Sequence, residues 1–324
     1  MQTFFVFFFR SKEQKIVTFA VRIAPNNMNE SSFTYFDTMN NTSYPGHQLK
    51  GKERYKKLYH FTSFDIFTRI WIAQELKYGS ISNVNDIQES LKYYSVNSLS
   101  HLPVMCAYQD ILSSYRQISF TMDIDSFLKG FMNTMMWGVY GDKTKGVCIE
   151  FDYDRIQFPK GTMTGIVKYK NFPLQHTVLP DNLKTLKQVK QYISKNLKQL
   201  FFQKQTIWKG ENEFRVISNG DEYLNIENAI TGVYLTTCMS KECQLVEELV
   251  KDAIPVKYLD FHQDNGVYLP CAYPTKTSRE EIIGAQNDPN NALELFYKQA
   301  WKYYEEHKND ENVSLILNSY SLKP

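Results

Sequence analysis

The chain has 324 residues, which is enough for one large domain or two small ones. Its hydrophobic share of 43% and charged share of 22% are ordinary for a globular protein, and its formal net charge of +2 excludes a chain-wide attraction to nucleic acid or membranes. The five cysteines form no CxxC pair, and no histidine follows at finger spacing, which argues against a zinc site. We therefore expect reduced thiols, no bound metal and a cytoplasmic protein.

Residues 1–52 are expected to form a variable N-terminal extension. The apolar run from Phe4 to Phe9 is shorter than the roughly 20 residues that cross a bilayer and lacks the features of a signal peptide, so no membrane association is predicted. Residues 1–27 are either an additional strand or an over-extended gene start, and both explanations stay open. The polar stretch from Asn29 to Lys52 is typical of a flexible N-terminus.

Short strands and helices alternate along the predicted domain, residues 53–275, and a helical tail is expected over residues 276–324. Helical segments such as the one after Ser63 open on a capping residue and continue with apolar residues at helical spacing. Strand segments are rich in β-branched and aromatic residues between turn residues. In chain order, the expected elements are a strand at 58–62, a helix at 64–74, a strand at 77–82, a turn at 83–86, a helix beginning near Glu89, strands at 117–121, 146–151 and 165–169, a helix at 179–209, strands at 213–218 and 232–236, a helix at 240–252, a hairpin of 255–261 with 266–272, and a helix at 291–308.

The predicted helix at 179–209 is strongly basic. Its apolar residues follow helical spacing, and its other faces carry lysines with almost no acid. Such a face is usually solvated, but it could also contact nucleic-acid phosphates. No aromatic residues are interleaved with the lysines, which weakens the case for stacking on single strands. The lysines in question are Lys184, Lys187, Lys190, Lys195 and Lys198.

The order of elements predicts an α+β fold. Strands and helices interleave without a strict βαβ rhythm, and no glycine-rich loop of the GxGxxG or Walker type occurs, which argues against a Rossmann or P-loop enzyme. We expect a split antiparallel or mixed sheet with flanking helices, in which sites lie in clefts between strands.

Six motifs occur in order along the chain. They are LYHFTS at 58–63, Asn85-Asp86 with Glu89, Ile118-Ser119-Phe120, MWGVYG at 136–141, KGVCIEFD at 145–152, and Lys204-x-x-x-Trp208 followed by ENEFR at 211–215. Together these motifs resemble the bacterial family DUF2971 over most of residues 57–273. The chain departs from the family at Ile87, where a proline or similar residue usually follows the Asn-Asp pair, and this departure concerns only the geometry of a turn.

The opening strand, helix and return strand are also similar, more distantly, to ADP-ribosyltransferase-like enzymes of the DarT type. That resemblance implies an ADP-ribosyltransferase-like sheet that uses NAD as a substrate. It implies that His60 holds the NAD ribose, that Ser119 or Tyr140 lies on a middle strand, and that Glu213 completes the triad. Glu211 and Glu213 would form the E-x-E end of such a site.

These residue types suit the chemistry that the resemblance implies. Cleavage of the nicotinamide–ribose bond develops an oxocarbenium-like cation, which a carboxylate such as Glu213 can stabilise. Glu211 could act as a base on the acceptor. An aromatic ring, that of Tyr140 or Trp137, could stack on nicotinamide. Further candidate binding residues are Tyr59, Thr62, Ser119, Asn85, Asp86 and Arg215.

Each candidate also has a structural explanation. A lone histidine in an apolar strand, such as His60, is most often a hydrogen-bonded core residue. Arg215 could pair with Glu211, because residues four apart on a strand face the same way, and Glu213 would share that face. Trp137 and Tyr140 could be core residues. Asn85 and Asp86 could simply shape a turn.

The leading hypothesis is an NAD-dependent ADP-ribosyltransferase-like enzyme that modifies a nucleic acid or a protein, as a toxin or phage-defence effector with an antitoxin or defence-system partner. One alternative is a hydrolase of NAD or another nucleotide in the same cleft. The other is a non-enzymatic binding or sensor module. The transferase hypothesis requires His60 and Glu213 to meet in one cleft with an aromatic residue beside them.

Overall fold

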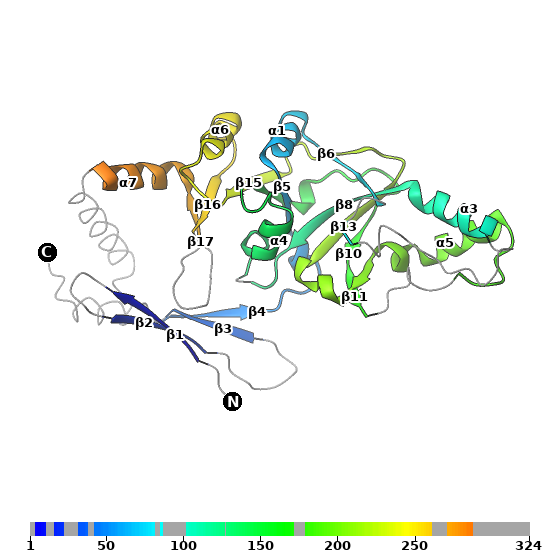
Figure 1. Cartoon of the computed structure of the whole chain (residues 1–324), viewed down its shortest axis with the longest axis horizontal. Helices are drawn as coiled ribbons and strands as arrows, with labels where there is room; N and C mark the ends of the chain where they lie inside the picture. The colour runs from blue at the N-terminus through cyan, green and yellow to red at the C-terminus, as the bar shows by residue number, and fades with distance from the viewer. Residues whose placement is uncertain are drawn as a thin grey trace. The chain divides into compact units, whose positions relative to one another are not determined.

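A computed structural model describes residues 4–10, 16–22, 32–37, 42–81, 85–86, 102–126, 128–171, 179–260 and 271–287. The chain gathers into two compact units (Figure 1). The central unit comprises residues 51–123 and 133–233, and the terminal unit comprises residues 1–50, 124–132 and 234–324. The expected domain of residues 53–275 stays a prediction, because division into compact units does not show which part of the chain folds independently.

The central unit is built on a sheet of mainly antiparallel strands. Its strands β10, β13, β8, β5, β9 and β15 are neighbours in that order, and the pair of β11 and β12 beside it is parallel. The α+β class and the mixed pairing are therefore confirmed. The strand bounds are β5 Lys57–Thr62, β6 Glu75–Lys77, β7 Gly79–Ser80, β8 Tyr115–Met122, β9 Val147–Asp152, β10 Met163–Ile166, β11 Lys168–Lys170, β12 Gln203–Gln205, β13 Glu213–Asn219, β14 Tyr223–Asn225 and β15 Ile230–Leu235.

The sheet splits between β5 and β8. All six residues of β5 pair with β9, whereas only Leu58 and Tyr59 pair with β8, opposite Met122 and Thr121. The other end of β8 pairs instead with the short strand β7, at Gln117 and Arg116. Among the strands that the structure describes, none pairs with residues 118–120 on this side. An opening therefore remains in the middle of the sheet.

Local capping signals place the helices. Ser63 accepts a hydrogen bond from the Ile66 amide, and Asn133 caps α4 in the same way. α5 is shorter than the predicted 179–209, because a capping box at Thr185 starts it and the chain then leaves it to form β12 beside β11. The helix bounds are α1 Phe64–Ala73, α3 Leu102–Ser113, α4 Thr134–Val139 and α5 Leu186–Phe201, with 3-10 turns η1 Gly51–Tyr55, η5 Tyr153–Arg155 and η7 Thr206–Glu211.

One hydrophobic cluster of the central unit lies where α3 and α5 pack on the sheet. Val189 and Ile193 of α5 are buried with Tyr108 and Leu112 of α3 and with Ile217 of β13. Burial of such apolar side chains stabilises the unit. One end of β8 and β13 is thereby anchored beside the split.

The terminal unit contains two hairpins near the N-terminus and a helix-flanked hairpin near the C-terminus. Residues 4–10 form a strand, as the first explanation of the apolar run required. The expectation that residues 29–52 are flexible is wrong at 32–37 and 42–47, which pair as strands. The elements are β1 Phe4–Arg10, β2 Ile16–Arg22, β3 Ser32–Asp37, β4 Thr42–His47, η4 Gly130–Met132, α6 Lys241–Val250, β16 Val256–Asp260, β17 Cys271–Pro274 and α7 Thr275–Asn287.

Two expected helices, the one beginning near Glu89 and the one at 291–308, lie outside the described residues. The expected return strand at 77–82 is divided into β6 and β7, which join different strands. No helix in the described parts of the chain is long and apolar enough to cross a membrane.

Candidate functional site

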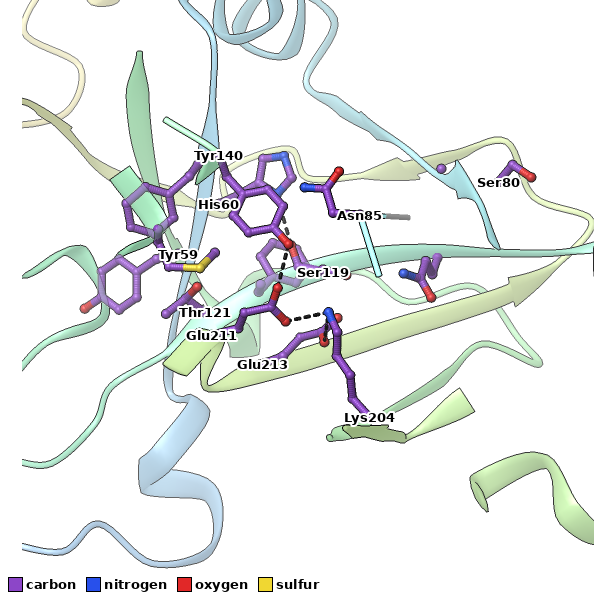
Figure 2. Close-up of a pocket in the computed structure, with 15 residues that line it drawn as sticks. Tyr59, His60, Ser80, Asn85, Ser119, Thr121, Tyr140, Lys204, Glu211 and Glu213 are labelled. Atoms are coloured by element: carbon purple, nitrogen blue, oxygen red, sulfur yellow. Dashed lines mark hydrogen bonds and ion pairs between the residues drawn. The ribbon is translucent and has the colours of Figure 1, made fainter. Parts of the chain in front are cut away.

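A pocket of about 330 Å³ occupies the split in the sheet (Figure 2). Its walls come from β5, β7, β8, α4, β12, η7 and β13, together with Asn85. Seven of the candidate residues line it, so the fold brings together side chains that lie far apart in the sequence. These are Tyr59, His60, Asn85, Ser119, Tyr140, Glu211 and Glu213.

His60 lies where β5 and β8 separate. Its Nδ1 atom is 3.1 Å from the Ser119 carbonyl oxygen, which can only accept a hydrogen bond, so Nδ1 carries the proton. Burial lowers the pKa of His60, and the hydrogen bond to Ser119 opposes this only in part. The imidazole is therefore neutral near pH 7, with its lone pair on Nε2. Within the described residues no hydrogen-bond partner of Nε2 is found.

Glu213 is held by Arg215 on the same face of β13. Arg215 donates from Nε to Oε1 at 2.6 Å and from a terminal nitrogen to Oε2 at 2.9 Å, and its other terminal nitrogen donates to the Phe201 carbonyl at 2.8 Å. Both side chains are buried, with residue exposures of 4% and 2%. Burial alone would raise the pKa of Glu213, but the charge and hydrogen bonds of Arg215, with help from Lys204, lower it. Glu213 is therefore ionised near neutral pH.

Glu211 reaches the same cluster by a different route. It ends η7, and the next residue, Asn212, takes a left-handed conformation before β13 begins. Its Oε1 accepts a 2.5 Å hydrogen bond from the Tyr140 hydroxyl, and its Oε2 accepts one of 2.6 Å from Lys204 Nζ. The expected pairing of Arg215 with Glu211 is therefore wrong, because Glu211 is not on the strand and Arg215 turns to Glu213.

The two carboxylates differ in their proton affinity. Burial raises the pKa of Glu211, and the nearby charge of Glu213 raises it further, while Lys204 and Tyr140 act in the opposite direction. The outcome is a raised pKa for Glu211 beside a lowered pKa for Glu213. Two neighbouring acids with separated pKa values can serve as a proton acceptor and a fixed charge.

Lys204 lines the pocket but was not among the candidate site residues of the sequence. Its Nζ lies 2.6 Å from Glu211 and 3.9 Å from Glu213, and 4.7 Å from the centre of the Trp208 ring. A signal was present, because two buried acids require two cations and Arg215 supplies only one. The lysine of the Lys204-x-x-x-Trp208 motif was one possible source of the second.

Thr121 was also missed as a wall residue. Its side chain is fully buried in the pocket wall, opposite Tyr59 on β5 and Glu213 on β13, and its hydroxyl has no hydrogen-bond partner in the described residues. The other wall residues that sequence analysis did not select are Phe61, Gly79, Ser80, Gln117, Phe120 and Met136.

Four candidates lie outside the pocket wall. Trp137 is 1% exposed and packs edge-on against Phe61, at 5.2 Å between ring centres, so it is a core residue. Thr62 and Asp86 are buried but do not line the pocket. Arg215 stands behind Glu213 and acts on the pocket only through it.

The region from α4 to β13 carries most of the charged cluster. Residues 136–216, which include Tyr140, Lys204, Glu211 and Glu213, match the model of a family described as "Protein of unknown function (DUF2971)". This region belongs to the DUF2971 family. The DUF2971 match contains neither His60 nor Ser119, which come from the preceding part of the chain. No curated protein and no solved structure is significantly similar to the chain.

The DUF2971 region therefore supplies one side of the pocket and the earlier strands supply the other. The charges of the carboxylates of Glu211 and Glu213 are balanced there by those of Lys204 and Arg215. All four side chains are buried, and burial strengthens each electrostatic interaction. The described residues contain no group of three or more histidine, cysteine or acidic side chains that could hold a metal ion. The groups that face the pocket are suited to hydrogen-bonding a polar ligand and to proton transfer.

Proposed function

We propose that the pocket is the active site of an NAD-dependent, ADP-ribosyltransferase-like enzyme that modifies a nucleic acid or a protein. The observation that carries the proposal is that His60, Tyr140 and the neighbouring acids Glu211 and Glu213, from three separate segments, line one pocket at the split of the sheet. The hypothesis required His60 and Glu213 to face one cleft with an aromatic side chain beside them, and that arrangement supports it. A toxin or phage-defence role, with an antitoxin or defence-system partner, is the setting that we propose for this activity.

The size of the pocket limits which part of NAD it would hold. Pockets for small ligands measure about 300 to 1,000 Å³, so about 330 Å³ lies at the lower end. This space suits the nicotinamide and its ribose better than a whole dinucleotide. The adenosine part would then lie outside the pocket.

The two acids would have distinct roles in the reaction. The bond between C1 of the ribose and the nicotinamide nitrogen breaks, its electron pair leaves with nicotinamide, and the acceptor oxygen or nitrogen forms the new bond to C1. The fixed charge of Glu213 would stabilise the developing cation. Glu211, whose pKa is raised, would take the proton from the acceptor. His60 Nε2 would accept a hydrogen bond from a ribose hydroxyl or from the carboxamide.

A hydrolase would use the same groups with water as the acceptor. The binding-module alternative is favoured by a different observation. Every carboxylate oxygen of Glu211 and Glu213 already has a partner in Tyr140, Lys204 or Arg215. A cluster that is complete without a ligand could serve only to hold the sheet together.

Incubation with NAD that carries its label in the ADP-ribose part separates these functions. We expect nicotinamide release with label on a macromolecule, and a fall of at least about 100-fold in Glu211→Gln, in the range that loss of a general base produces. The matched control is Glu222→Gln, which changes an exposed acid that lies 4.0 Å from Arg116 and outside the pocket wall. Release without transfer would identify a hydrolase. No release in the wild type would favour the binding module.

A further inference from the structure

The solvent face of α5 is a concentrated basic surface. It consists of Lys187, Lys190, Lys195 and Lys198, all exposed, and Lys184 lies just before the helix. The sequence contains no acidic residue between Asp181 and Glu211. Without these five lysines, the formal charge of the chain would be −3 instead of +2. This segment is therefore basic with no acid to compensate it, whereas the chain as a whole is close to neutral.

The four helical lysines share one side of α5. At about 100° per residue they fall within an arc of about 140°, and from Lys187 to Lys198 they extend over about 16 Å. Gln191 and Ser194, which are uncharged hydrogen-bonding residues, lie between them on the same arc. A strip of this length and chemistry matches several successive phosphates of a nucleic-acid backbone.

An ordinary solvated helix face would look different. Exposed helices usually alternate charges, because opposite charges three or four residues apart stabilise them and like charges destabilise them. α6 follows that rule at its end, where Glu247 and Glu248 precede the capping residue Lys251 by four and three residues. α5 instead places lysines three residues apart, at 187 and 190 and at 195 and 198. An anionic partner would offset this repulsion.

A membrane surface fits α5 poorly. A helix that lies on a membrane inserts its apolar face among the lipids. The apolar face of α5 is already used, since Val189, Ile193 and Leu200 are buried against α3 and the sheet. Figure 1 shows α5 beside α3 at one end of the central unit. Apart from Leu186, the exposed residues of α5 are lysines, glutamines and a serine, which leaves a polar and basic surface for a partner.

We propose that the basic face of α5 binds the phosphate backbone of a nucleic acid. The binding would be independent of base sequence, because the face carries no aromatic side chain for stacking. α5 leads directly into β12, which carries Lys204 into the pocket wall, so a bound strand would lie along the segment that supplies the site. That this nucleic acid is the acceptor rests on the proposed function, whereas its binding does not.

The test is fluorescence anisotropy with short labelled DNA and RNA duplexes, repeated at several salt concentrations with the full chain. If all four helical lysines contact phosphates, wild-type affinity should fall about 100-fold between about 50 and about 200 mM salt. The variant with Lys187, Lys190, Lys195 and Lys198 changed to Gln should lose most of this dependence. Glutamine is a good helix former, and circular dichroism verifies that the fold is kept.

A matched control variant carries the same change of charge elsewhere. It replaces the exposed residues Lys77, Lys145, Lys160 and Lys241 by Gln and should keep the wild-type affinity and salt slope. Equal loss in both variants, or binding of vesicles rich in anionic lipid without binding of either duplex, would overturn the proposal. NAD turnover is measured separately. Its absence in the wild type would count against the proposed function alone.

Discussion

Replacement of Arg215 by Met tests the charged cluster most directly. The change removes both hydrogen bonds to Glu213 and the one to the Phe201 carbonyl, and it leaves Glu213 buried with Lys204 3.9 Å away as the remaining cation. Loss of one partner of a buried ion pair costs about 3–5 kcal/mol. Because Lys204 still compensates in part, we expect the free energy of unfolding to fall by about 3 kcal/mol, near the lower end of that range.

The assay is urea unfolding of the wild type and of three variants. Arg116→Met is the matched control, because its pair with Glu222 is exposed and 4.0 Å long, and it should cost less than about 1 kcal/mol. Glu213→Gln combined with Arg215→Met should be more stable than Arg215→Met alone, since no unpaired charge is then buried. If Arg215→Met lowers the free energy of unfolding no more than Arg116→Met does, the buried pair of Glu213 and Arg215 does not stabilise the fold as proposed.

The pH dependence gives a second measure of the same pair. The pKa of Glu213 is lowered in the folded protein, so the pair contributes stability above the unfolded pKa of about 4.3. That contribution is lost as the pH falls through the lowered folded value. In Arg215→Met the cause of the lowering is removed, and the difference in stability between wild type and variant should shrink as the pH falls. A constant difference across this range would contradict the assignment.

Three further predictions follow from the pocket and the turn beside it. His60→Asn keeps a donor at the position of Nδ1 but has no atom at the position of Nε2, whereas His60→Gln keeps a polar atom near Nε2 and loses the Nδ1 donor. His60→Asn should keep the stability of the wild type and lose about tenfold in kcat/KM for NAD. Equal effects of the two variants would contradict the assignment of the proton to Nδ1. Lys204→Met should raise the pKa of Glu211, because Lys204 lowers it in the wild type, and should therefore shift the acid limb of the pH–rate profile to higher pH. An acid limb at the wild-type pH would exclude Glu211 as the titrating base. Gly146→Ala would place its Cβ 2.2 Å from a backbone carbonyl oxygen of β5, so it should lower the free energy of unfolding by about 1–3 kcal/mol or more and lower the thermal midpoint. Gly138→Ala, which has open space around the added Cβ, should be neutral or slightly stabilising.

Local signals in the sequence predicted many of the elements. Ser63 identified the start of α1, and the strands β5, β8, β9 and β13 fall where β-forming residues were recognised. These predictions succeeded because caps and strand propensities depend on a few neighbouring residues. The start of α5 was misplaced because its apolar periodicity extends past the capping box at Thr185, and the box, not the periodicity, sets the boundary.

The sequence alone therefore determined the residue types of the site, the E-x-E spacing and the α+β class. Only the tertiary structure decided how these residues meet. β8 exchanges β5 for β7 as its neighbour, which opens the pocket, and the left-handed Asn212 turns Glu211 away from Arg215 and toward Lys204. Spacing along a chain shows which side chains share a strand face, but strand neighbours and charge partners depend on contacts between segments distant in sequence.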